Sequence, residues 1–157
     1  MLKERIEKIS AQLEQNEGFI ITSSSNRQYV TGFRSSAGTV LITKTESFLF
    51  IDSRYFEKAS ATVKHLKVIL AKNTVEQIKE TLEKYGIDFL YTETSNLSVD
   101  EYKRFSEKFS PVTVSDNGKM DNLVTEYRAV KDSSEIECIK AAQVITDLPP
   151  LFGPVST

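Results

Sequence analysis

Residues 18–59 read GFIITSSSNRQYVTGFRSSAGTVLITKTESFLFIDSRYFEKA, and the order of apolar and polar runs in this stretch decides the fold. The run at 19–21 is too short for a helix and predicts a buried strand. Two further apolar runs, at 39–43 and 48–51, are separated by the polar residues 44–47 and predict a hairpin with a four-residue loop. The stretch therefore supplies three strands of a sheet.

Helices and short apolar runs alternate along the rest of the chain. Capping-box patterns, in which Ser or Thr is followed three residues later by Glu or Gln, begin at Thr74 and Ser98 and predict two helix starts. The alternation predicts an α/β fold of three layers, in which helices flank a mixed sheet of roughly six strands. The other predicted features are a first helix with apolar residues Leu2, Ile6, Ile9 and Leu13, a helix at 54–63, strands at 66–70, 89–91 and 112–114, and an apolar face of Val99, Tyr102, Phe105 and Phe109 on the last helix before 112.

The composition is that of a globular chain of one-domain length. It has 157 residues, of which 39% are hydrophobic and 27% charged. The net charge of −2 gives no electrostatic reason to expect a nucleic acid or an anionic membrane as a partner. Residues 1–7 include the charged residues Lys3, Glu4, Arg5 and Glu7 and predict no secretory signal. No apolar run approaches the ~20 residues that span a bilayer. With Cys138 as its single cysteine, the sequence indicates a cytoplasmic protein.

The residues offer little chemistry of their own. His65 is the only histidine, and it lies between a predicted helix and a predicted strand, where a solvated surface residue is expected. Neither H-x-x-x-H nor H-E-x-x-H occurs, so the sequence predicts no metal site of these kinds. Cys138 lies on an apolar helix face, which favours a packed thiol over a nucleophile. We therefore expect no catalytic residue and no cofactor in this chain.

The polar turn Ser23–Asn26 follows the first strand and allows two interpretations. Its hydroxyl and N–H groups suit an anion, such as the phosphate of a nucleotide. Ser and Asn also favour the N-cap of a helix, and a short helix through 26–30 would use them in that way. We favour the cap and keep the anion site as the alternative.

Two groups of motifs occur in a fixed order. Asn26, Tyr29 and Thr31–Phe33 are followed by Asp52–Tyr55, and residues 127–136 later read YRAVKDSSEI. Their order and separation resemble the amino-terminal domain of the creatinase/aminopeptidase P family of Xaa-Pro peptidases. The last motif is similar to the segment that joins this domain to the metallopeptidase half, so the resemblance extends to about residue 147.

The resemblance implies a creatinase/prolidase-type, ribonuclease H-like domain at residues 1–131. Residues 132–147 would be a linker helix that begins the catalytic domain, and the Pro-rich tail 148–157 departs from the family pattern. The implied parent removes an amino-terminal residue that precedes proline, and it uses two divalent metal ions, which we expect to be manganese. The family's metal ligands lie in the carboxyl-terminal domain, so this chain would be inactive alone. Prolidase and creatinase are the other possible parents.

The resemblance also points to five candidate site residues. In the family, this domain of one subunit packs beside the active site of a neighbour. The candidates on that side, for contact with substrate or with the neighbouring subunit, are Phe33, Arg34, Asp52, Arg54 and Tyr55. An arginine can bind a peptide carboxylate through two parallel hydrogen bonds, and an aromatic ring can line a proline pocket. The structural alternative makes Asp52 a helix N-cap, Arg54 part of a first turn, and Phe33 a core residue.

Two functions follow. The first is the non-catalytic domain of an Xaa-Pro aminopeptidase, which contributes oligomer contacts and restricts substrate length. Its partners would be a second copy in a homo-oligomer, expected to be a dimer, and proline-containing peptides bound by the parent. The second is a stand-alone, peptidase-like module that binds a protein or peptide.

Overall fold

A computed structural model describes residues 2–129 of the chain. Residues up to Thr125 form one compact unit, and Glu126–Ala129 belong to a second. The predicted linker helix at 132–147, Cys138 and the tail at 148–157 lie outside the described residues. The elements are α1 (Leu2–Ser10), β1 (Glu17–Ile21), α2 (Ser24–Thr31), β2 (Thr39–Thr43), β3 (Ser47–Ile51), α3 (Ser53–Thr62), β4 (Lys67–Leu70), α4 (Thr74–Lys84), β5 (Phe89–Tyr91), α5 (Val99–Phe109), β6 (Thr113–Val114) and α6 (Lys119–Ala129).

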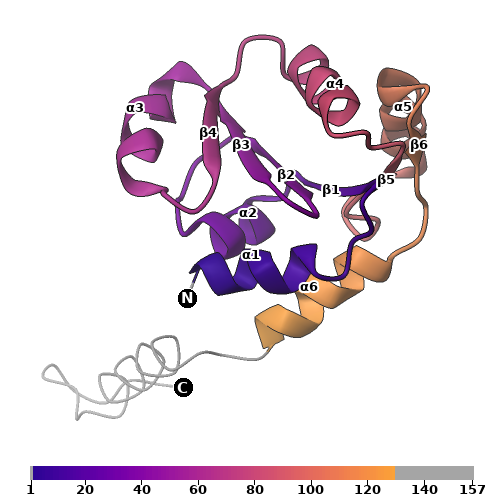
Figure 1. Cartoon of the computed structure of the whole chain (residues 1–157), viewed down its shortest axis with the longest axis horizontal. Helices are drawn as coiled ribbons and strands as arrows, with labels where there is room; N and C mark the ends of the chain where they lie inside the picture. The colour runs from indigo at the N-terminus through magenta and orange to yellow at the C-terminus, as the bar shows by residue number, and fades with distance from the viewer. Residues whose placement is uncertain (1, 130–157) are drawn as a thin grey trace, which may run out of the picture. The chain divides into compact units, whose positions relative to one another are not determined.

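The six strands form one mixed sheet in the order β4-β3-β2-β1-β5-β6 (Figure 1). β2 runs antiparallel to both of its neighbours, while β3–β4, β1–β5 and β5–β6 pair in parallel. Five strands therefore end at one edge of the sheet, and β2 begins there. The prediction of an α/β fold with a mixed sheet of roughly six strands is confirmed.

Alternating side chains of the strands build a core on each face of the sheet. One core joins Ile20, Leu41 and Phe50 to apolar side chains of α4 and α5. The next residues along the same strands, such as Ile21 and Val40, are also buried and point to the opposite face. Figure 1 shows α4 and α5 on one side of the sheet and α1 and α2 on the other. The sheet is thus the middle of three layers.

The hairpin between β2 and β3 is one residue tighter than the sequence predicts. Ser47 is the first residue of β3 and pairs with Ile42, so the loop is 44–46. Thr43 closes this loop, because its hydroxyl accepts from the N–H of Glu46 at 3.0 Å and donates to the carbonyl of Glu46 at 2.7 Å. The hydrogen bonds of the Thr43 side chain therefore stabilise a loop that is one residue shorter than expected.

Two helix starts follow the sequence prediction, and one does not. Asp52 caps α3, and Ser98 forms a complete capping box with Glu101. α4 is capped by Asn73 rather than Thr74, with its side chain accepting from the N–H of Glu76 at 3.4 Å. The amide of Gln77 is used elsewhere, since it donates to the carbonyl of Leu70 at 2.9 Å and ties the helix to β4. The Thr74 capping box was therefore wrong by one residue.

The structure corrects two other expectations about burial. Val99, placed on the apolar face of α5, is 70% exposed because it stands in the first turn of the helix. His65, expected to be a solvated surface residue, is half-buried, and its Nε2 lies 2.7 Å from the carbonyl oxygen of Val30. It thereby joins the start of β4 to the end of α2.

α2 ends at Gly32, which has a left-handed φ of 70°. A non-glycine residue is strained at this φ. A Cβ atom here would also lie 2.6 Å from Cδ1 of Leu2, so α1 packs directly on this turn. The glycine of the Thr31–Phe33 motif is therefore favoured by the left-handed backbone, and any other residue would also have to displace the end of the Leu2 side chain.

Replacing Phe50 by Asp should destabilise the fold by at least about 3 kcal/mol, because the ring is 1% exposed in the core and a carboxylate there would have no partner. The free energy of unfolding from urea denaturation would measure this. Val99→Asp is the matched control and should leave stability almost unchanged. Equal losses in the two variants would contradict the assigned core.

Candidate functional site

The carboxyl edge of the sheet is where the polar residues of the fold gather. Thr22 follows β1, Asp52 follows β3, Glu93 lies two residues beyond β5, and Ser115 follows β6. Because five strands end at this edge, the residues that follow them lie along one line of the molecule. In open α/β sheets, ligands bind at this edge, which makes it the place to examine.

A buried carboxylate, that of Glu93, organises the centre of this edge. Glu93 is 2% exposed. Its oxygens accept from the backbone N–H groups of Thr22 and Ser23, from the Ser23 hydroxyl, and from the side-chain amide of Asn26 at 2.8 Å. A buried carboxylate is tolerated when donors surround it in this way. The bonds fix the start of α2 against the end of β5.

The hydrogen bonds of Glu93 decide between the two interpretations of the turn Ser23–Asn26. The N–H and hydroxyl donors that would hold an external anion already bind the chain's own Glu93. The Ser23 side chain also accepts from the N–H of Asn26 at 3.4 Å, as a helix N-cap does. The N-cap interpretation of this turn is confirmed.

The side chain of Arg27 connects α2 to the loop at 32–38 through hydrogen bonds. Its guanidinium is buried, and it donates to the carbonyl oxygens of Thr22 and, at 2.8 Å, of Ser35. Burial lowers the pKa of this guanidinium, and the nearby charge of Glu93 opposes that shift. Gly38 lies alongside, where an added Cβ would stand 3.5 Å from Nε of Arg27. The buried guanidinium of Arg27 therefore fixes the position of this loop.

The same loop meets the start of α3 in an exposed corner. Phe33 packs edge-on against Tyr55, with ring centroids 6.2 Å apart. The Tyr55 hydroxyl lies 2.9 Å from the Ser36 hydroxyl, and the Arg54 guanidinium lies over the Tyr55 ring. Arg54 also pairs with Asp52 at 2.8 Å, and Asp52 caps the helix through the N–H of Arg54. Phe33, Asp52, Arg54 and Tyr55 thus form one contiguous group.

Arg34 lies apart from these contacts. It stands on the exposed side of the loop, and among residues 2–129 its side chain forms no hydrogen bond, ion pair or ring contact. The structure therefore brings together four of the five predicted residues and leaves the fifth as a free cation beside them.

The ionisable groups of the corner influence one another. The hydrogen bond from Arg54 lowers the pKa of the Asp52 carboxyl, and Asp52 in turn raises the pKa of Arg54. The hydrogen bond with Ser36 is the main cause that lowers the pKa of Tyr55. At neutral pH the Asp52–Arg54 pair is fully charged. Its guanidinium is consequently engaged before any ligand arrives.

Glu93 and Arg27 were missed in the sequence. Glu93 follows the predicted strand 89–91 after one residue, as Asp52 follows the strand 48–51. Residues just beyond such strand ends lie where ligands bind in open α/β sheets, so the position of Glu93 was the signal that could have found it. No local pattern marks Arg27 as buried, because its partners include a carbonyl eight residues away.

The described residues do not fit the two-metal site that the resemblance implies for the parent. Nowhere in residues 2–129 do three or more His, Cys, Asp or Glu side chains converge as metal ligands. The same residues include no helix long and apolar enough to span a bilayer.

Known proteins resemble this chain along most of its length. A sequence model of the Creatinase/Prolidase N-terminal domain matches residues 5–130. The uncharacterized peptidase YqhT of Bacillus subtilis is 30% identical over 132 residues, which are 83% of this chain and 36% of that protein. A putative Xaa-Pro aminopeptidase of Mycoplasma pneumoniae is 31% identical over 92% of this chain and 40% of its own length. The chain thus spans about two fifths of these relatives.

Solved structures share the fold. An Xaa-Pro dipeptidase from Bacillus anthracis superposes with a TM-score of 0.76 at 24% identity, covering 87% of this chain and 38% of that one. A structure titled as an Xaa-Pro aminopeptidase from Streptococcus pyogenes gives a TM-score of 0.69 at 30% identity, covering 78% of this chain and 96% of that one.

Glu93→Gln should destabilise the chain by about 1–3 kcal/mol, because the glutamine NH₂ would face donors that need an acceptor. Chemical denaturation measures the change. Glu80→Gln, on the exposed face of α4, is the matched control and should have little effect. If both variants unfold at the same denaturant concentration as the parent, Glu93 does not organise this edge.

The Asp52–Arg54 pair should give a pH-dependent contribution to stability. Since the pKa of Asp52 is lowered in the folded state, its contribution is present above the ordinary aspartate pKa and is lost as the pH falls through the lowered value. Asp52→Asn keeps an N-cap side chain and removes the ion pair. The difference in Tm between parent and variant should therefore shrink on acidification, and a difference independent of pH would contradict the assignment.

Proposed function

The chain belongs to the creatinase/prolidase N-terminal domain family, and we propose that it is the non-catalytic, amino-terminal domain of an Xaa-Pro aminopeptidase. The observation that carries the proposal is the family match over residues 5–130 of a chain that spans about two fifths of its curated relatives. The relative from Mycoplasma pneumoniae bears the name putative Xaa-Pro aminopeptidase. The remaining three fifths of the parent would hold two divalent metal ions, manganese in our proposal, and perform the hydrolysis in the cytoplasm.

The exposed corner would be the part of this domain that serves the parent. In a homodimer, Phe33 and Tyr55 would present their packed rings to the active site of the neighbouring subunit and limit the room for substrate. Arg34 has a guanidinium that is free to bind a peptide carboxylate through two hydrogen bonds. Arg54 is already paired with Asp52, so we assign it the task of holding the corner in shape.

The chain alone should not hydrolyse Xaa-Pro peptides, with or without added manganese. The reason is that, in our proposal, the ligands of the parent's metal site lie in its carboxyl-terminal domain and not in this amino-terminal domain. Release of free amino acid, measured on protein freed of host aminopeptidases, should remain at background. Turnover that rises in proportion to the amount of chain and survives further purification would refute the non-catalytic role.

Joining residues 1–131 of this chain to the carboxyl-terminal remainder of the Mycoplasma pneumoniae relative tests the corner directly. Arg34→Ala in that chimera should raise KM for short Xaa-Pro peptides several-fold, while Arg104→Ala, an exposed arginine on α5, should not. Arg54→Ala should leave the melting of the isolated domain nearly unchanged, since exposed ion pairs contribute little stability. If Arg54→Ala unfolds the isolated domain, and if Arg34→Ala and Arg54→Ala both leave substrate use by the chimera unaltered, the corner does not belong to the site.

A further inference from the structure

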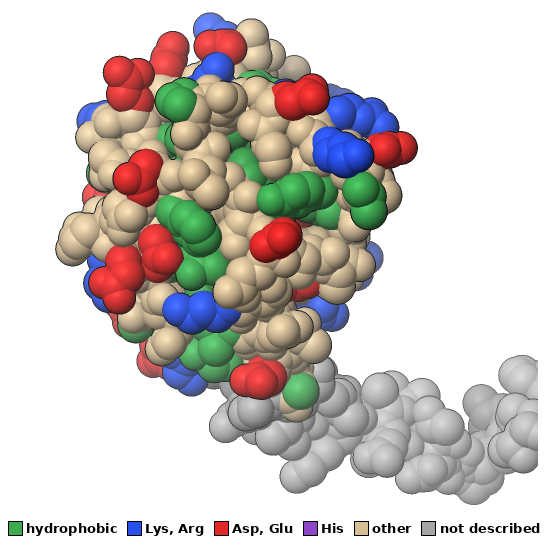
Figure 2. Space-filling model, turned by 90° about the vertical axis from the view of Figure 1, so that its right-hand side faces the viewer, with side chains coloured by type: hydrophobic (Ala, Val, Ile, Leu, Met, Phe, Trp, Pro, Cys, Tyr) green, Lys and Arg blue, Asp and Glu red, His purple; other side chains and the backbone are tan. Residues whose placement is uncertain are grey.

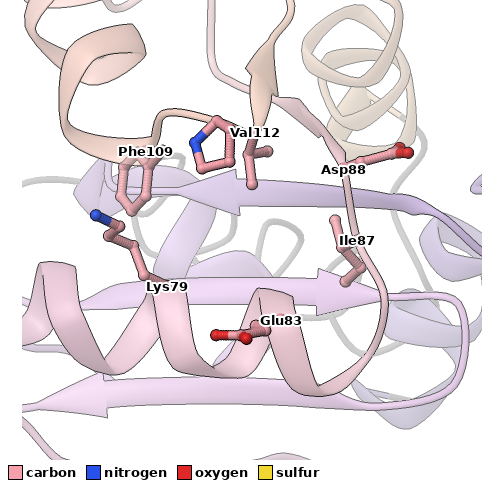
Figure 3. Close-up of a pocket in the computed structure, with 7 residues that line it drawn as sticks. Lys79, Glu83, Ile87, Asp88, Phe109 and Val112 are labelled. Carbon is pink, nitrogen blue, oxygen red and sulfur yellow. The ribbon is translucent and has the colours of Figure 1, made fainter.

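A cavity of about 380 Å³ opens between α4, α5 and the residues that lead into β5 and β6 (Figure 3). Its lining includes Ile87 and Asp88, just before β5, and Pro111 and Val112, just before β6. It therefore lies at the amino edge of the sheet, whereas the corner at Asp52–Tyr55 lies at the carboxyl edge. The cavity is a separate place in the fold.

The floor of the cavity is apolar. Ile87 and Phe109 are 4% and 3% exposed, and Pro111 and Val112 complete the apolar lining. Figure 2 turns the α5 side of the molecule toward the viewer and shows hydrophobic side chains grouped between acidic and basic ones on that face. A ligand here would gain from burying an apolar group.

The rim carries one cation and one anion without partners. Lys79 and Glu83 stand on successive turns of α4, and within residues 2–129 neither side chain forms a hydrogen bond or an ion pair. Figure 3 shows the ammonium and the carboxylate pointing apart rather than at each other. The third charged residue, Asp88, points away from the cavity and accepts from the Asn16 side chain at 2.7 Å.

These charges narrow the chemistry of the ligand. An inorganic phosphate or a nucleotide would face the carboxylate of Glu83, and a polyamine would face the ammonium of Lys79. A purely apolar ligand would leave both charged groups of the rim without a partner. The volume is at the lower end of the roughly 300–1,000 Å³ typical of ligand sites, so the ligand is small. A compact zwitterion with an apolar body satisfies all of these conditions.

We propose that this cavity binds a free apolar α-amino acid in its zwitterionic form. The ligand carboxylate meets Nζ of Lys79, the ligand ammonium meets the carboxylate of Glu83, and the ligand side chain lies on Ile87, Phe109 and Val112. Residues four apart on a helix have Cβ atoms about 5–6 Å apart, so two long side chains can reach both charged groups of one amino acid. The proposal does not depend on the function of the parent.

Titration of the ¹⁵N-labelled chain with leucine tests the proposal, with amide chemical shifts as the readout. We expect saturable shifts confined to residues around Lys79, Glu83, Ile87 and Val112, with Kd on the order of 1 mM. Leucine methyl ester lacks the carboxylate and N-acetyl-leucine lacks the ammonium, and each should bind at least about tenfold more weakly. Equal binding of either analogue, or no saturable shift with leucine, overturns the proposal.

Variants of the rim complete the test. Lys79→Met and Glu83→Gln should each weaken leucine binding several-fold, and the double exchange Lys79→Glu with Glu83→Lys should recover part of it. The matched controls on the same helix, Lys84→Met and Glu80→Gln, lie outside the lining and should bind as the parent does. Folding of every variant is checked by its amide spectrum. Equal weakening in the controls and the rim variants would contradict the assigned site.

Discussion

The carboxylate of Glu93 is the constraint on which the carboxyl edge of the sheet depends. A buried charge is costly unless donors surround it, and here the donors come from the turn between β1 and α2. Meeting that requirement fixes where α2 begins. α2 then places Arg27, and Arg27 holds the loop that carries Phe33 and Arg34. One desolvated carboxylate thus determines the geometry of an exposed corner that it does not touch.

The direction of the strands explains why the carboxyl and amino edges of the sheet differ. Because β2 alone runs antiparallel, the residues that follow the other five strands all lie at one edge, where hydrogen-bonded side chains gather. At the opposite edge the chain enters β5 and β6 from helices, and apolar residues such as Ile87 and Val112 lead into the strands. Polar contacts order the first edge, and an apolar cavity with a charged rim opens at the second.

Most of the fold could be predicted from the sequence, because short apolar runs and helical faces are local patterns. The errors arose where a distant contact or the position of a residue within its element decides burial. His65 looks like a junction residue until Val30, 35 residues earlier, supplies a carbonyl. Val99 has an apolar side chain, yet it falls in the exposed first turn of α5. At the site, four of the five candidate residues do form one group, whereas Glu93 and Arg27 gain their importance only through contacts that no local pattern contains.

Mass spectrometry of the protein purified from its native source tests our proposal that this chain is one domain of a longer peptidase. We expect an intact mass well above that of 157 residues, with peptides beyond Thr157 that include the Asp, His and Glu ligands of a metal site. A native chain that ends at Thr157 would contradict it.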